Sequence, residues 1–315
     1  MSLPRRHRLV GVLAAVGLAF SSAACGSAEE PAGAAVSTRS VTDATGVSVA
    51  VPTEPKRVIA LSEQDLDGAL ALGVTPVGTV NGRGQTTPPK YLGDQVTSIA
   101  VVGDVAKPTM DKLVAAQPDL ILAGSVTDAQ ILADLRKLAP TVVTYKPADD
   151  WKQAFTALAD ALGKSAAAKG WLAQYDAKVT EAKAAFGANA GAEVSIVRWN
   201  PQGPGIMQTG HFASLVAADL GLKRPAGQQE PGFAHSEPLS LENLGKVDAG
   251  WLFVGTLNPA GKQALDSARA HPAYQQLKAV RAGKVVDVDG TVWTSRGGPA
   301  AALLVVADIR KTLAG

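Results

Sequence analysis

The stretch from Trp151 to Gly187 constrains the fold most, because it interrupts an otherwise regular alternation of strands and helices. Residues 151–162 have helical patterning that stops at a glycine, and Ser165 is placed to cap a second helix running to about Phe186. Apolar residues recur three or four apart along that helix, at Leu172, Tyr175, Val179 and Ala182. No strand is predicted in this stretch. We therefore expect one long, rigid helix, residues 164–188, joining two lobes.

Short apolar strands alternate with helices on both sides of this stretch, after an opening hairpin over residues 40–51. The predicted strands are 57–61, 76–80, 119–123, 141–145, 193–198, 250–254 and 284–288, and the predicted helices are 66–72, 110–116, 128–138, 212–220, a short one from 241, and 299–313. Such alternation is typical of parallel sheets covered by helices. The predicted fold is α/β, with two Rossmann-like lobes, residues 39–163 and 189–315, on one helical connection.

The N-terminus has the pattern of an export signal. Arg5, Arg6 and Arg8 precede an apolar run, residues 9–20, which is shorter than the ~20 residues of a spanning helix. Small residues follow, and then Cys25, the single cysteine of the chain. The pattern predicts a signal peptide over residues 1–24. Residues 25–38 would be a lipidated cysteine and a flexible tether, which anchors the protein on the outer face of the membrane. A plain signal peptide and twin-arginine export remain alternatives.

The charge balance argues against a nucleic-acid partner. The chain has 30 basic and 28 acidic residues, and removing Arg5, Arg6 and Arg8 with the leader leaves 27 against 28, about −1. Nucleic-acid binding needs a clustered basic surface to neutralise phosphates. No run of basic residues follows the leader.

Several segments, in their order and spacing, resemble the iron–siderophore, haem and cobalamin substrate-binding proteins of ABC importers. They are Arg57–Leu61, Leu70–Gly78, Pro108–Leu122, Leu220–Pro225, Ser240–Leu244, His271–Val285 and Gly297–Ala301. The resemblance covers residue 39 to the end. It implies two α/β lobes joined by a rigid helix, with the ligand between them. It also implies a monomer that is not an enzyme, has no intrinsic cofactor, and delivers a ferric siderophore to a permease with its cytoplasmic ATPase.

Candidate ligand contacts follow predicted strands of both lobes. Ligands of open α/β sheets lie beyond the carboxyl ends of the strands. Arg198 and Trp199 end one strand, and Trp293 and Arg296 follow another. Weaker candidates are Glu63, Gln64, Arg83, Phe233 and His235. Guanidinium groups suit the oxygen-rich shell of a ferric siderophore, and indole faces suit its apolar arms.

Two acids have a different predicted role. The resemblance implies that an acid near the start of an equivalent helix on each lobe docks against arginines of the permease. Asp111 and Glu242 occupy those positions. Such separated charges guide orientation and encounter more than affinity. Helix dipoles alone would also favour acids there.

Other functions have less support. The sequence lacks a Gly-x-Ser-x-Gly nucleophile elbow and a phosphate-binding Gly-rich loop, which argues against the common hydrolases and nucleotide enzymes. His211, His235 and His271 are dispersed, so direct binding of a free metal ion is a minor alternative, and no metal ligands are assigned. Haem and cobalamin remain rival cargoes. A hydroxamate siderophore is favoured over a catecholate, because the C-terminal loops lack three clustered basic residues.

Overall fold

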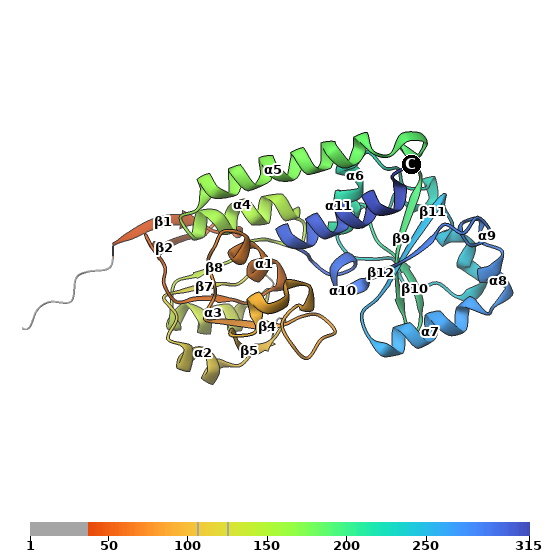
Figure 1. The fold of residues 1–315 in the computed structure, drawn as a ribbon. Coiled ribbons are helices and arrows are strands. Elements are labelled where there is room, and N and C mark those ends of the chain that lie inside the picture. Colours follow the sequence, from red (N-terminus) through yellow and green to blue (C-terminus); the bar gives the residue numbers. More distant parts are fainter. Residues whose placement is uncertain (1–36, 106, 125) are drawn as a thin grey trace, which may run out of the picture. The chain divides into compact units, whose positions relative to one another are not determined.

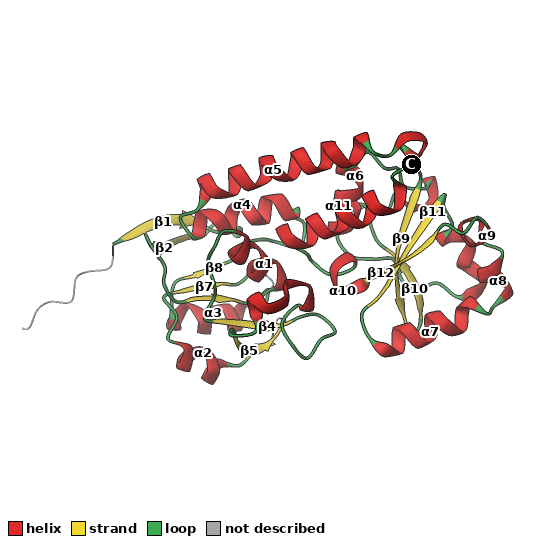
Figure 2. Cartoon of the chain, in the orientation of Figure 1, coloured by secondary structure: helices red, strands yellow, loops and turns green. Residues whose placement is uncertain are grey.

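A six-stranded sheet organises the first half of the protein (Figures 1 and 2). The computed structural model describes residues 37–105, 107–124 and 126–315. The predicted signal peptide, Cys25 and most of the predicted tether lie outside these residues. The strands, in spatial order, are β6 (Lys107–Pro108), β5 (Ala100–Asp104), β4 (Gly78–Asn81), β3 (Val58–Ala60), β7 (Leu120–Leu122) and β8 (Thr141–Val142). Only β5 and β6 pair antiparallel; the other pairs are parallel.

A four-stranded sheet organises the second half. Its spatial order is β10 (Gly203–Ile206), β9 (Val194–Asn200), β11 (Trp251–Thr256) and β12 (Val285–Asp289). β9, β11 and β12 are parallel, and β10 returns antiparallel along β9. Phe253 pairs in register with Ile196 and Val286. The central strands are buried, as expected for a parallel sheet covered on both faces.

Helices cover both sheets (Figure 2). In the first half they are α1 (Glu63–Ala71), α2 (Met110–Ala116), α3 (Ala129–Leu138), α4 (Trp151–Ala161) and the 3₁₀ segment η1 (Lys90–Val96). In the second half they are α6 (Phe212–Asp219), α7 (Pro259–Arg269), α8 (Pro272–Gln275), α9 (Lys278–Arg281), α10 (Gly290–Trp293), α11 (Pro299–Leu313), η2 (Gly187–Asn189), η3 (Ala226–Gln228) and η4 (Leu241–Val247). Within the described residues, no helix combines the length and apolarity needed to cross a membrane.

One long helix, α5 (Ser165–Ala184), belongs to the cores of both halves (Figure 1). Near its start Ala168 packs in the cluster that contains Leu120 and Phe155. Further along, Tyr175, Val179 and Ala182 pack in the cluster that contains Val194, Ile196 and Phe253. The predicted cap is wrong, however. Lys164 is the N-cap residue and makes no side-chain cap bond, and Ser165 is already the first helical residue.

A second contact joins the halves at α1 and α11. The carboxylate of Asp67, on α1, accepts hydrogen bonds from the backbone N–H groups of Gly298, Ala300 and Ala301, where α11 begins. The hydroxyl of Tyr91 donates to the same carboxylate at 2.9 Å. The carboxylate thereby satisfies N–H groups that a helix start otherwise leaves unpaired.

The opening hairpin is confirmed as β1 (Thr38–Thr42) and β2 (Ser48–Pro52), paired antiparallel. The Asp43 carboxylate closes its turn by accepting the backbone N–H groups of Thr45 and Val47. Val41 and Val51 are buried against the first half. The hairpin is therefore an integral part of that half.

The α/β class and the two-lobe arrangement predicted from the sequence are confirmed. α2 and α11 have the predicted bounds. β8 is shorter than predicted, and the sequence analysis missed β5, β6, β10 and α7 to α10.

Candidate ligand-binding site

A basic pocket of about 200 Å³ lies where loops of both sheets meet. It is lined by Arg83, Arg198, His211, Phe233, Ala234, His235, Thr294, Ser295 and Arg296. Arg83 follows β4 of the six-stranded sheet, whereas Arg198 lies on β9 of the four-stranded sheet. The remaining residues come from loops of the second half. The structure thus brings together five residues that the sequence suggested, namely the three arginines, Phe233 and His235.

Arg198 is partly buried. Its guanidinium donates to the carbonyl oxygen of Thr294, and its Nε has no hydrogen-bond partner among the described residues. Burial, and then the charge of Arg83, lower its pKa to about 10. The guanidinium remains charged at neutral pH and keeps unpaired donors at the pocket. Buried donors without a partner are costly, so they mark a place where a ligand would be stabilised.

Glu63 positions the loop that carries Arg83. It is the first residue of α1, is 4% exposed, and accepts a 2.6 Å hydrogen bond from the backbone N–H of Arg83. Burial raises its pKa to about 7, although the hydrogen bond from Arg83 and the charges of Arg83 and Arg198 act in the opposite direction. Glu63 does not line the pocket itself. It instead supports the pocket through its contact with the Arg83 backbone.

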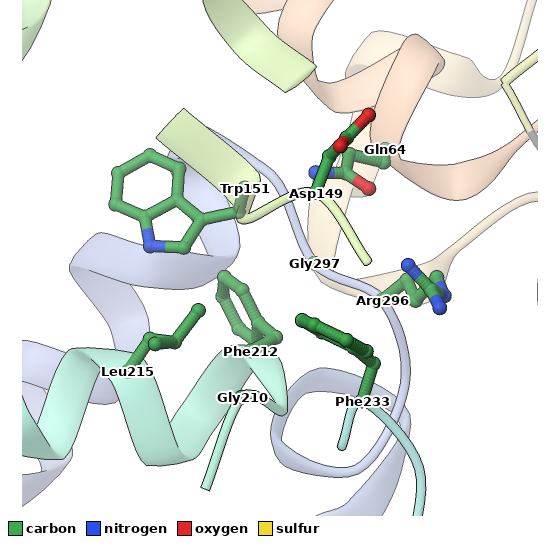
Figure 3. Close-up of a pocket in the computed structure, with 9 residues that line it drawn as sticks. All are labelled: Gln64, Asp149, Trp151, Gly210, Phe212, Leu215, Phe233, Arg296 and Gly297. Carbon is green, nitrogen blue, oxygen red and sulfur yellow. The ribbon is translucent and has the colours of Figure 1, made fainter. Parts of the chain in front are cut away.

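Arg296, with Phe233, also lines a smaller cavity (Figure 3). Its guanidinium lies 5.6 Å from the centre of the Tyr145 ring and donates to the carbonyl of Pro147 at 3.1 Å. The smaller cavity is lined by Gln64, Asp149, Trp151, Gly210, Phe212, Leu215, Phe233, Arg296 and Gly297. Figure 3 shows aromatic rings on one side and Gln64, Asp149 and Arg296 on the other. Gln64, a weaker candidate from the sequence, therefore lies beside the site.

Two histidines complete the lining. His211, the N-cap residue of α6, is 3% exposed, and its Nδ1 has no partner among the described residues. Burial and the neighbouring arginines hold its pKa well below the usual range, so the ring is neutral. The Nδ1 of His235 lies 2.8 Å from the carbonyl oxygen of Ser236. The sequence analysis missed Thr294, Ser295 and Ala234, although the first two lie inside the segment it singled out.

Trp199 and Trp293, which the sequence suggested as ligand contacts, do not line this pocket. Trp199 is 2% exposed and packs edge-on to Tyr274 in the core of the second half. Successive side chains of a strand point to opposite faces, so β9 sends Arg198 to the pocket and Trp199 away from it. Trp293 is fully buried, stacks on Phe253 at 4.8 Å and donates from Nε1 to Asp308.

The predicted docking acids are exposed, one on each half. Asp111 lies in the first turn of α2, and Glu242 in the first turn of η4. Among the described residues, no group of three or more His, Cys, Asp or Glu side chains is arranged to hold a metal ion.

Two α/β halves, each built on its own sheet, are joined by a long helix, and residues of both halves line a polar pocket. This arrangement is typical of substrate-binding proteins of the periplasmic type. A family model described as periplasmic binding protein matches residues 58–292, and the chain belongs to this family.

Relatives narrow the family to iron uptake. The chain is 31% identical over 299 residues to the probable siderophore-binding lipoprotein YfiY of Bacillus subtilis (strain 168), covering 91% of this chain and 92% of that protein. It is 28% identical to the Fe(3+)-citrate-binding protein YfmC of the same organism, covering 76% of this chain and 75% of the relative. The crystal structure of Staphylococcus aureus SirA complexed with staphyloferrin B has a TM-score of 0.77 at 26% identity, covering 88% of this chain and 98% of that chain.

These similarities place the chain among the iron–siderophore substrate-binding proteins of ABC importers. The relatives are transport proteins rather than enzymes, and the haem and cobalamin alternatives are not favoured. In this family the iron complex is cargo, not a resident cofactor. Relatives named as lipoproteins or periplasmic proteins agree with an extracytoplasmic location.

Proposed function

We propose that this protein captures a ferric siderophore in the basic pocket and delivers it to the permease of an ABC importer. The observation that carries the proposal is the convergence of Arg83, Arg198 and Arg296 from the two halves of the protein, two of them on loops and Arg198 on β9. A ferric siderophore fills the coordination sphere of its iron with its own oxygens. The protein therefore needs donors for an oxygen-rich surface, which guanidinium groups supply.

The pocket must open to admit such a ligand. Its volume of about 200 Å³ is below the ~300–1,000 Å³ of ordinary small-molecule sites. Phe233 offers an apolar face to the ligand, and Glu63 holds the Arg83 loop in place. Because α5 packs in both cores, we expect the opening to be a small adjustment of the loops and of the two halves, residues 39–163 and 189–315.

Delivery to the membrane uses other surfaces. Asp111 and Glu242 are exposed on separate halves, so the pair can orient the loaded protein on a basic permease surface. Lipidation of Cys25, after cleavage of residues 1–24, would hold a monomer at the outer face of the membrane through the tether 25–38. The ATPase of the importer would then drive uptake.

Equilibrium dialysis of the purified protein carrying Cys25→Ser against metal-labelled ligands, with radioactive iron or, for cobalamin, radioactive cobalt, tests the proposal. The panel is a ferric trihydroxamate, a ferric tris-catecholate, ferric citrate, haem and cobalamin. Saturable binding of at least one ferric siderophore, weakened tenfold or more (about 1.4 kcal/mol) by Arg198→Ala or Arg296→Ala, is the expected result. Binding of haem or cobalamin alone, or of none of the five, would refute the proposed cargo.

A further inference from the structure

The pocket carries more positive charge than a neutral ligand requires. Arg83, Arg198 and Arg296 all line it. Across residues 37–105, 107–124 and 126–315, none of the three forms a salt bridge with a carboxylate within 4.0 Å. Arg83 and Arg198 repel each other strongly enough to help lower the pKa of Arg198. The positive charge is therefore not balanced by the pocket lining.

Acids near the pocket do not cancel this charge. Glu63 lies beneath the Arg83 loop, and its pKa of about 7 leaves it only partly ionised at neutral pH. Asp149 lines the adjacent cavity, where it accepts the backbone N–H of Lys146 at 2.7 Å. Even with both acids ionised, three guanidinium groups leave at least one excess positive charge.

A fourth arginine, Arg224, does not line the pocket but adds positive charge near it. Arg224 donates to the carbonyl oxygen of Met207, and its Nε and Nη1 have no partner in the described chain. Burial lowers its pKa to about 10, so it remains charged, and its charge contributes to keeping His211 neutral. Charges that are buried without partners are destabilising unless a counter-charge arrives.

Ferric siderophores differ in net charge according to their donor groups. Three hydroxamates, each with one negative charge, balance Fe³⁺ and give a neutral complex. Three catecholates give an excess of three negative charges, and citrate-type complexes keep free or excess carboxylates. Guanidinium pairs strongly and in a bidentate manner with such oxygens. The lack of three clustered basic residues in the C-terminal loops favoured a hydroxamate in the sequence analysis, but in the structure Arg83 of the first half joins Arg198 and Arg296 in one pocket.

We infer that the cargo is a ferric complex with a net negative charge, whose outer carboxylate or catecholate oxygens contact Arg83, Arg198 and Arg296. This inference rests on the proposed function and names its substrate class. Hydroxamate groups are compatible with it when carboxylates on the same ligand keep the complex anionic.

A charge series tests this inference. The purified protein carrying Cys25→Ser is titrated with ferric dicitrate, a ferric tris-catecholate and a neutral ferric trihydroxamate, each at 50 and at 500 mM salt. We expect one of the anionic complexes to bind at least tenfold more tightly than the neutral one, and its affinity to fall with salt as screening increases. The two anionic ligands separate carboxylate from catecholate recognition.

Matched variants locate the effect. Arg198→Gln and Arg296→Gln should each weaken the anionic ligand tenfold or more while changing the neutral ligand less than threefold. Arg198→Lys keeps the charge but loses the planar fork, and should fall between. Arg281→Gln, an exposed arginine on α9, is the control and should change neither. Circular dichroism confirms that each variant is folded.

The outcomes separate the two proposals. Tight, salt-insensitive binding of the neutral trihydroxamate, unaffected by the arginine variants, would leave siderophore capture intact and overturn the inference about charge. Binding of none of the three complexes would overturn both.

Discussion

The side chain of Asp67 and the backbone of Ala300 tie the two halves of the protein together. Asp67 Oδ1 accepts the N–H of Ala300 at 2.7 Å, and its Oδ2 accepts those of Gly298 and Ala301 at 3.2 and 3.1 Å. Asp67 is fully buried on α1, and the three N–H groups begin α11. A carboxylate at this position also interacts favourably with the helix dipole. The contact anchors the segment that follows Arg296.

Removing this carboxylate should destabilise the protein. Asp67→Ala leaves three N–H groups without an acceptor, and we expect the free energy of unfolding to fall by about 2–3 kcal/mol. Asp67→Asn keeps one acceptor oxygen and should lose about half as much. Urea denaturation measures both. Asp266→Ala, at an exposed i,i+4 pair with Lys262, is the control and should stay within ~0.5 kcal/mol. A similarly small loss for Asp67→Ala would contradict this role.

Glu63 should make stability depend on pH. Its pKa is about 7 in the folded protein, against an ordinary value of 4.5. Below pH 4.5 the group is protonated in both states. As the pH rises from 4.5 through 7, only the folded state holds the proton, so the free energy of unfolding decreases, in total by about 3 kcal/mol. Urea denaturation between pH 5 and 8 should show a flatter profile for Glu63→Gln. Parallel profiles for the two proteins would rule out the shift.

Trp293 should affect stability rather than recognition. Trp293→Ala removes a fully buried ring that stacks on Phe253, and we expect a loss of about 3–5 kcal/mol in the free energy of unfolding. Trp293→Phe keeps the stacking but loses the hydrogen bond to Asp308, so the loss should be smaller. Urea denaturation measures the stability of both variants, and ligand titration measures their affinity. If Trp293→Phe weakened binding tenfold at unchanged stability, the ring would have to contact the ligand.

The docking acids should affect uptake without affecting capture. Asp111→Lys and Glu242→Lys reverse exposed charges that are not part of the pocket lining, so ligand affinity should change less than twofold. Uptake of iron-labelled ligand by cells should fall several-fold for each, and further for the pair. Asp94→Lys, another exposed acid on the first half, serves as the control. Equal uptake by all of these variants would exclude docking through these two positions.

Cys25 should decide where the protein is found. Cys25→Ala removes the thiol that would carry the lipid, and we expect the protein to move from the membrane fraction to the soluble extracytoplasmic fraction. Detergent phase partitioning followed by immunoblotting measures this. A protein that stays with the membrane after the substitution would require another means of attachment.

Much of the fold could be predicted from local signals. α11 begins at Pro299 and α2 has a regular apolar pattern, so both bounds were predicted correctly. β10 was missed because its sequence, Gly-Pro-Gly-Ile, lacks strand propensity and depends on pairing with β9. α7 was missed although Asn258 caps it and Pro259 starts it, because few of its residues are apolar.

The site was predictable only in part. Arg198 and Arg296 were suggested because each lies near the carboxyl end of a predicted strand, and both line the pocket. Successive residues of a strand point to opposite faces, so the neighbour Trp199 lies in the core. Arg83 and Arg198 line the same pocket because of the way the two sheets are joined, and nothing local in the sequence predicts that they are close. His211 was considered only among dispersed histidines for a free metal ion, because its burial at the pocket depends on tertiary packing.

The position of α5 in two cores has a consequence for how the chain melts. Unfolding either half would strip packing partners from this helix and so weaken the other half, while the contact of Asp67 with α11 would be lost in the same event. Heating should therefore give one cooperative transition despite two separate sheets. For the same reason, if the chain is divided at α5, each fragment should have far less than half the free energy of unfolding of the whole protein.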